Sequence, residues 1–167
     1  MPGLVTLSIL NWFHLVATVV WIGGVFINNL ALSPSARKSL EPPIMGKFIG
    51  TYVKRFGVLA YVSMGVLIIT GVIMMVMNPH NGSTAATGNL WTQFTIVKHV
   101  FVAILIIIGI YIMQFLSPKM ERLGAKGPSP EVAKLQKQLI VLGITSLIVA
   151  SIILAFTAIT GAISVLS

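Results

Sequence analysis

Hydrophobic residues run along the chain in four long, nearly uninterrupted stretches, and polar residues gather between them. The stretches cover approximately residues 4–32, 56–77, 91–116 and 139–165. Each one reaches the roughly 20 apolar residues that a helix needs to cross a bilayer. Continuous apolar runs of this length are typical of membrane helices rather than of strands. The pattern therefore predicts an all-α integral membrane protein, with residues 1–167 forming a single four-helix bundle.

The segments between these stretches differ sharply in charge. Residues 33–55 and 117–138 hold every lysine and arginine except Lys98, whereas residues 78–89, NPHNGSTAATGN, hold no charged residue. Basic loops of membrane proteins stay on the cytoplasmic side. We therefore expect an up-down-up-down bundle with two cytoplasmic loops and with both termini on the outer, non-cytoplasmic side. Such a protein is a multi-pass protein of the inner or plasma membrane.

Proline positions support these boundaries, because proline breaks helices. The prolines that lie between the predicted helices are Pro34, Pro42, Pro43, Pro79, Pro118, Pro128 and Pro130. No convincing internal repeat is evident, although the two helical hairpins have similar layouts.

Composition agrees with a membrane protein and excludes other classes. The chain is 56% hydrophobic and only 8% charged, against about 25% charged residues in a typical soluble domain. The formal net charge of +8 would suit nucleic acid, but the basic residues lie in the loops that orient the helices. The lipid bilayer, and not nucleic acid, is therefore the expected partner. Cysteine is absent, which excludes disulfides and thiolate chemistry.

Three ionisable residues lie within the predicted spans: His14, Lys98 and His99. Such groups are costly in hydrocarbon and usually face the interior of the bundle. His14 and His99 lie at a similar depth, roughly 12–15 Å below the outer surface at a rise of 1.5 Å per residue. The first and third helices of an up-down bundle are diagonal partners. The two imidazoles are therefore expected to point at each other across the core.

Haem b fits two imidazoles placed in this way, because histidine is a common axial ligand of haem iron. The leading hypothesis is a membrane b-type cytochrome with His14 and His99 as the iron ligands. It would transfer electrons with a quinone or a redox partner protein.

Neighbouring residues are expected to complete the haem site. Thr95 lies one turn before His99 and is expected to orient its ring, as outer-shell groups do. Gly71 on the second helix would leave room for a flat group. Lys98 and Asn11 would meet the propionates, since a lysine at this depth extends its ammonium toward the surface.

A second interpretation is copper binding at the outer end of the second helix. Met74, Met77 and His80 gather there, and thioethers and imidazole are ligands that suit Cu(I). Methionine is also a common apolar filler, and packing is the more frequent explanation for such a group. Haem therefore stays the first choice and copper the alternative cofactor.

Two motifs resemble known membrane families. The first helix contains FHLVATVVWIGGVF, and the third begins with LWTQFTIVKH. Over residues 8–115 this pairing resembles the copper-resistance D-type membrane domain and the related small membrane protoporphyrinogen oxidases. The resemblance implies a helical bundle with a functional histidine at His14 and a functional lysine at Lys98. It implies copper uptake across the inner membrane in one case, and haem or porphyrin binding and oxidase activity in the other. His99 is not part of either shared pattern.

Several functions stay open on this basis. They are electron transfer by a b-type cytochrome, copper binding or uptake, a haem-dependent porphyrinogen oxidase, and a structural subunit in which the histidines only pack. A homodimer or a place in a larger membrane complex is also expected, because four helices make a small bundle.

Overall fold

The computed structural model describes residues 2–77 and 90–166, and all the regular structure of this part is helical. Within it, four helical stretches are long and apolar enough to cross a membrane. This confirms the predicted all-α multi-pass membrane protein. In chain order the elements are α1 (Pro2–Ile27), η1 (Asn28–Leu32), α2 (Ser33–Ser39), α3 (Pro42–Met77), α4 (Leu90–Tyr111), η3 (Ile112–Leu116), α5 (Ser117–Gly124) and α6 (Pro130–Leu166).

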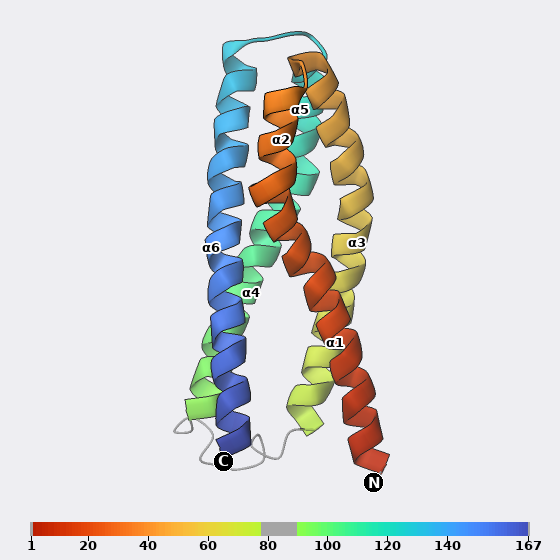
Figure 1. Cartoon of the computed structure of the whole chain (residues 1–167), viewed down its shortest axis with the longest axis vertical. Helices are drawn as coiled ribbons and strands as arrows, with labels where there is room; N and C mark the ends of the chain where they lie inside the picture. The colour runs from red at the N-terminus through yellow and green to blue at the C-terminus, as the bar shows by residue number, and fades with distance from the viewer. Residues whose placement is uncertain (1, 78–89, 167) are drawn as a thin grey trace.

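The helices pack as two pairs (Figure 1). α1 packs along α3, and α4 packs along α6. Both termini lie at one end of the molecule, which we call the terminal end; α2 and α5 lie toward the opposite end, which we call the basic end. The two pairs separate toward the terminal end in Figure 1, and α5 joins them at the basic end through its packing on α3 and α6.

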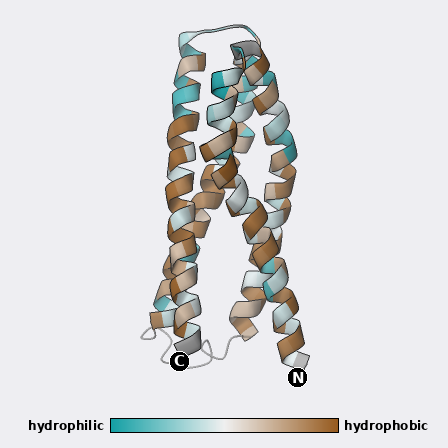
Figure 2. Ribbon diagram, in the orientation of Figure 1, coloured by the Kyte–Doolittle hydropathy of each residue, from teal (hydrophilic) through white to brown (hydrophobic). Residues whose placement is uncertain are grey.

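Helical structure extends through most of both segments that were expected to be loops, residues 33–55 and 117–138. α3, for example, has 36 residues, which corresponds to a length of about 54 Å. The hydrocarbon core of a bilayer is only about 30 Å thick. The helices therefore extend well past the hydrocarbon. Figure 2 shows that hydrophilic residues concentrate at the basic end.

Two prolines lie inside these continuous helical stretches, contrary to the expectation that they end the helices. Pro34 and Pro118 each follow a π-helical turn, η1 or η3. In these turns Ser33 N–H donates to Asn28 O, and Ser117 N–H donates to the carbonyl five residues before it. Proline has no N–H to place. The wider π-turn therefore allows the chain to continue in helical form past the ring.

The same two segments share a three-residue motif, and we call this pair of segments the internal repeat. Leu32-Ser33-Pro34 after η1 matches Leu116-Ser117-Pro118 after η3. Each triplet leads into a short helix, α2 or α5. The first and third spans therefore end at the basic end in the same way, and π-turns of this kind are frequent at functional sites.

The main core lies where the two pairs meet. Ala60 and Ala150 are completely buried there; small residues let membrane helices approach closely. The buried members of this core are Trp21, Ile22, Ala60, Met64, Leu105, Val149, Ala150 and Ile153.

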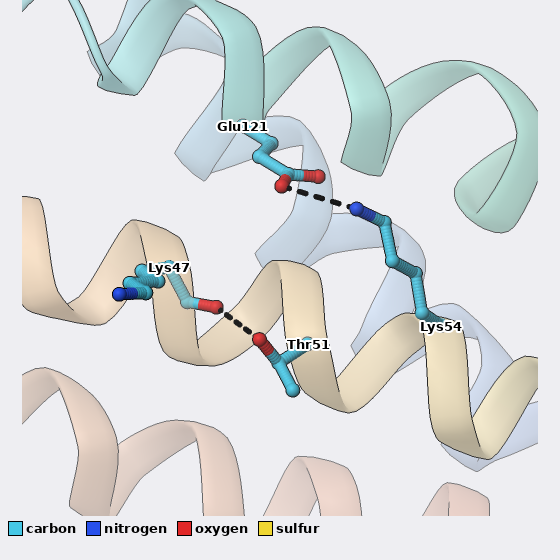
Figure 3. Close-up of polar contacts among 4 residues, drawn as sticks. All are labelled: Lys47, Thr51, Lys54 and Glu121. Atoms are coloured by element: carbon cyan, nitrogen blue, oxygen red, sulfur yellow. Dashed lines mark hydrogen bonds and ion pairs between the residues drawn. The ribbon is translucent and has the colours of Figure 1, made fainter.

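An ion pair joins α3 to α5 at the basic end (Figure 3). Lys54 Nζ lies 3.3 Å from Glu121 Oε1, and Thr51 Oγ1 donates to Lys47 O one turn earlier on α3. The two charged side chains are 72% and 42% exposed, so the pair contributes at most about 1 kcal/mol. The Glu121 carboxylate also lies against Gly50, where a Cβ would come within 2.8 Å of its Cδ. The absence of a side chain at Gly50 therefore leaves room for the Glu121 carboxylate.

Candidate functional site

His14 lies half-buried on α1 and is held by α3. Its Nδ1 is 2.8 Å from Thr70 Oγ1. Thr70 Oγ1 in turn donates to Val66 O over 2.6 Å, so the single hydroxyl proton of Thr70 is already used. Thr70 Oγ1 is then available to accept a hydrogen bond from His14 Nδ1–H. The hydrogen bonds therefore fix the tautomer of His14 and leave the lone pair of Nε2 free.

Gly71 lies against the same imidazole. A Cβ at Gly71 would be 3.5 Å from His14 Cε1, an ordinary packing distance. Gly71 was expected to leave room for a flat cofactor. In the structure, the His14 ring itself packs over this glycine.

His99 on α4 is held in an equivalent way by its own helix. Its Nδ1 lies 2.6 Å from Thr95 O. A carbonyl oxygen only accepts, so Nδ1 carries the proton and the lone pair of Nε2 is again free. The expected partner was the Thr95 side chain, but the backbone oxygen of Thr95 makes the contact. Thr95 Oγ1 is buried and has no partner in the described part of the chain.

The structure brings His14, Lys98 and His99 into one region. His14 lies within range of charge–charge interaction with both other residues. Lys98 is half-buried, whereas His99 is exposed, contrary to the expectation that its imidazole faces the interior of the bundle. The two imidazoles come from different helix pairs, His14 from the α1–α3 pair and His99 from the α4–α6 pair. A ligand held by both would connect the two pairs.

The other predicted site residues contribute little to this region. Asn11 is exposed, Met74 is half-buried and Met77 is exposed at the terminal end of α3. His80 lies outside the described residues. Within residues 2–77 and 90–166, no group of three or more His, Cys, Asp or Glu side chains is placed to hold a metal ion. The candidate site therefore consists of two imidazoles beside one lysine.

Thr70 is the site residue that the sequence analysis did not find. A threonine in an apolar helix usually bonds to its own backbone and faces any direction. Thr70 makes that bond, but it is buried with only 6% of its surface exposed and also meets His14. The sequence could have indicated Thr70 through its position next to Gly71, because Gly71 was already expected to lie near the histidines.

Comparison with known proteins gives one family. The model of the family described as Copper resistance protein D matches residues 50–160, which is more than half of the chain. The match confirms the resemblance to the copper-resistance D-type domain. Lys98 and His99 lie inside the matched range, and His14 lies before it. No curated protein and no solved structure matches the chain.

Proposed function

We propose that this chain, which belongs to the copper resistance protein D family, is a membrane protein that binds copper through His14 and His99. The observation that carries the proposal is the hydrogen bonding of the two rings. Each Nδ1 is engaged, by Thr70 Oγ1 or by Thr95 O, and each Nε2 is left with a free lone pair. Metal-binding histidines have this arrangement, since the bond at one nitrogen fixes the tautomer that ligates through the other.

Cu(I) is the form of copper that fits two imidazoles best. Imidazole nitrogen is a good copper ligand, and a d¹⁰ ion with no geometric preference is satisfied by two donors. Cu(II) prefers a tetragonal set of nitrogen and oxygen ligands. The described residues supply no acidic group beside the pair. Cu(I) would therefore be the transported substrate, and the two neutral imidazoles would hold it within the membrane.

The charge distribution supports an orientation for this cargo. Every lysine and arginine except Lys98 lies toward the basic end, which by the positive-inside rule faces the cytoplasm. His14 and His99 then lie in the outer half of the membrane. Copper would reach them from the outer side of the inner or plasma membrane, which is the direction of uptake.

Removal of each imidazole tests the proposal. The purified protein would be titrated with Cu(I) against a chromogenic chelator, as wild type and as His14→Ala, His99→Ala and His80→Ala. We expect both site variants to lose high-affinity binding of one ion. His80→Ala should bind as wild type does. Full binding by both His14→Ala and His99→Ala would contradict the site, and loss in His80→Ala alone would show that copper binds at His80 instead.

Haem b is the second candidate, and Lys98 is the observation that favours it. A cation beside the histidine pair repels a copper ion, whereas it would pair with a haem propionate. The two functions therefore predict opposite effects of Lys98→Met. Copper affinity should rise, because the charge repulsion between Lys98 and the copper ion is removed. Haem retention should fall, and Lys98→Arg, which keeps the charge, is the matched control for both measurements.

The visible spectrum of the protein decides between the two candidates. Low-spin haem with two histidine ligands gives a sharp Soret band and narrow bands on reduction. A colourless protein that was produced with adequate haem, and that binds one Cu(I), supports copper.

A further inference from the structure

A cavity of about 120 Å³ lies toward the basic end, between the two segments of the internal repeat. From the first segment Asn28 and Ser33 line it, and from the second Ile112 and Ser117 line it. It contains neither His14 nor His99, so it is separate from the candidate copper site.

The repeat explains why the cavity contains an unpartnered hydroxyl. In the first segment, Ser33 Oγ donates to Asn28 Oδ1 over 3.2 Å. In the second segment the residue at the position of Asn28 is Ile112, which offers no acceptor. Ser117 Oγ is consequently buried, with only 5% of the residue exposed, and has no hydrogen-bond partner in the described part of the chain. A buried donor without a partner is costly, so this position calls for an acceptor from a bound molecule.

The other walls indicate what kind of molecule carries that acceptor. Trp21, Phe56 and Leu105 form an apolar part of the cavity wall. Tyr52 and Phe56 lie parallel, with ring centroids 5.6 Å apart and an angle of 3° between the ring planes. Flat aromatic walls of this kind suit a flat ring.

The charged residues favour an occupant that accepts hydrogen bonds. No acidic residue lines the cavity, and Arg37 does. A hydroxyl proton and a guanidinium both require an acceptor oxygen. Trp21, Phe56 and Leu105 lie within stretches that are long and apolar enough to span the bilayer, so a membrane-soluble ligand suits this part of the cavity.

We propose that this cavity binds the head ring of a membrane quinone, with one quinone oxygen accepting a hydrogen bond from Ser117 Oγ. A quinone is flat, neutral and apolar except for its acceptor oxygens, which matches the walls described above. The chain is thus a quinone-binding protein in addition to its proposed role with copper.

Trp21 provides a direct measurement, because it lines the cavity and quinones quench tryptophan fluorescence. The other two tryptophans, Trp12 and Trp91, would be replaced by phenylalanine, which leaves Trp21 as the only indole. Copper-free protein in nanodiscs of neutral phosphatidylcholine would then be titrated with decylubiquinone. We expect saturable quenching.

Two variants and one control locate the binding. Ser117→Ala removes the donor and should weaken binding by roughly three- to tenfold, the value of one neutral hydrogen bond. Ser146→Leu places a larger side chain in the cavity from α6 and should abolish saturable quenching. Ser151→Leu makes the same change on the same helix at an exposed position outside the cavity and should bind as the parent does.

Each other outcome overturns the proposal. Quenching that rises linearly with quinone and is equal in all variants means that quinone only partitions into the bilayer. Saturable quenching that is unchanged in both Ser117→Ala and Ser146→Leu means that quinone binds elsewhere. If Ser146→Leu does not fold, as judged by its helical circular dichroism, Ser117→Ala alone decides between these results.

Discussion

Thr70 is the residue at which the proposed site can be tested most sharply. Thr70→Val keeps the shape of the side chain but removes the oxygen that accepts His14 Nδ1–H. The ring then loses the bond that fixes both its tautomer and its direction. Replacing such outer-shell partners typically lowers metal affinity about 10- to 100-fold, which corresponds to roughly 1.4–2.7 kcal/mol. We expect a loss of Cu(I) affinity in this range with no ligand removed.

Two further variants separate the hydrogen bond from other effects of the change. Thr70→Ser keeps the hydroxyl and should bind Cu(I) nearly as wild type does. Thr145→Val removes a hydroxyl that makes the same kind of bond to its own helix, to Val141 O over 2.9 Å, at an exposed position. It should leave affinity unchanged.

The measurement is a competition titration of all three variants against one Cu(I) chelator. Wild-type affinity in Thr70→Val would refute the role of the His14–Thr70 bond. Equal losses in Thr70→Ser and Thr70→Val would show that packing, rather than the hydroxyl, is responsible.

Two other predictions concern packing and orientation. Gly143→Ala on α6 should be less stable than Gly161→Ala by about 1 kcal/mol, because the new methyl would overlap Asn29 Oδ1 and displace the side chain whose Nδ2 donates to Val25 O. Gly161 has open space at its Cβ, and equal melting temperatures for the two variants would contradict this contact. The orientation can be tested with single cysteines, because the chain has none of its own. Ser35→Cys should react with a membrane-impermeant thiol reagent only from the cytoplasmic side, and Ser83→Cys only from the outer side. The reverse result would invert the proposed orientation.

The sequence predicts the four spans because a membrane helix is a property of composition over about 20 residues. The run from Leu139 to Val165, for example, is recognisable as a membrane helix without knowledge of any neighbouring helix. The full length of the helices is harder to predict from the sequence. Pro34 and Pro118 resemble helix ends, and only the preceding π-turns show how the helical structure continues past them.

The candidate site is predictable in its charged residues but not in their supports. His14, Lys98 and His99 stand out because ionisable groups are rare at membrane depth. Thr70 does not stand out, since its role depends on the packing of α3 against α1. Likewise Ser117 becomes informative only when the structure shows that it is buried and that its repeat partner Ser33 has the acceptor it lacks.

The pairing of the helices has a consequence for how the chain assembles. Each pair, α1 with α3 and α4 with α6, carries most of its packing within itself. A chain cut between Met77 and Leu90 would therefore yield two fragments, each with its own helix–helix interface intact. Neither fragment would hold both histidines, and neither would hold both serines of the repeat. Copper binding by the two fragments expressed together would consequently report that the halves have recognised each other within the membrane.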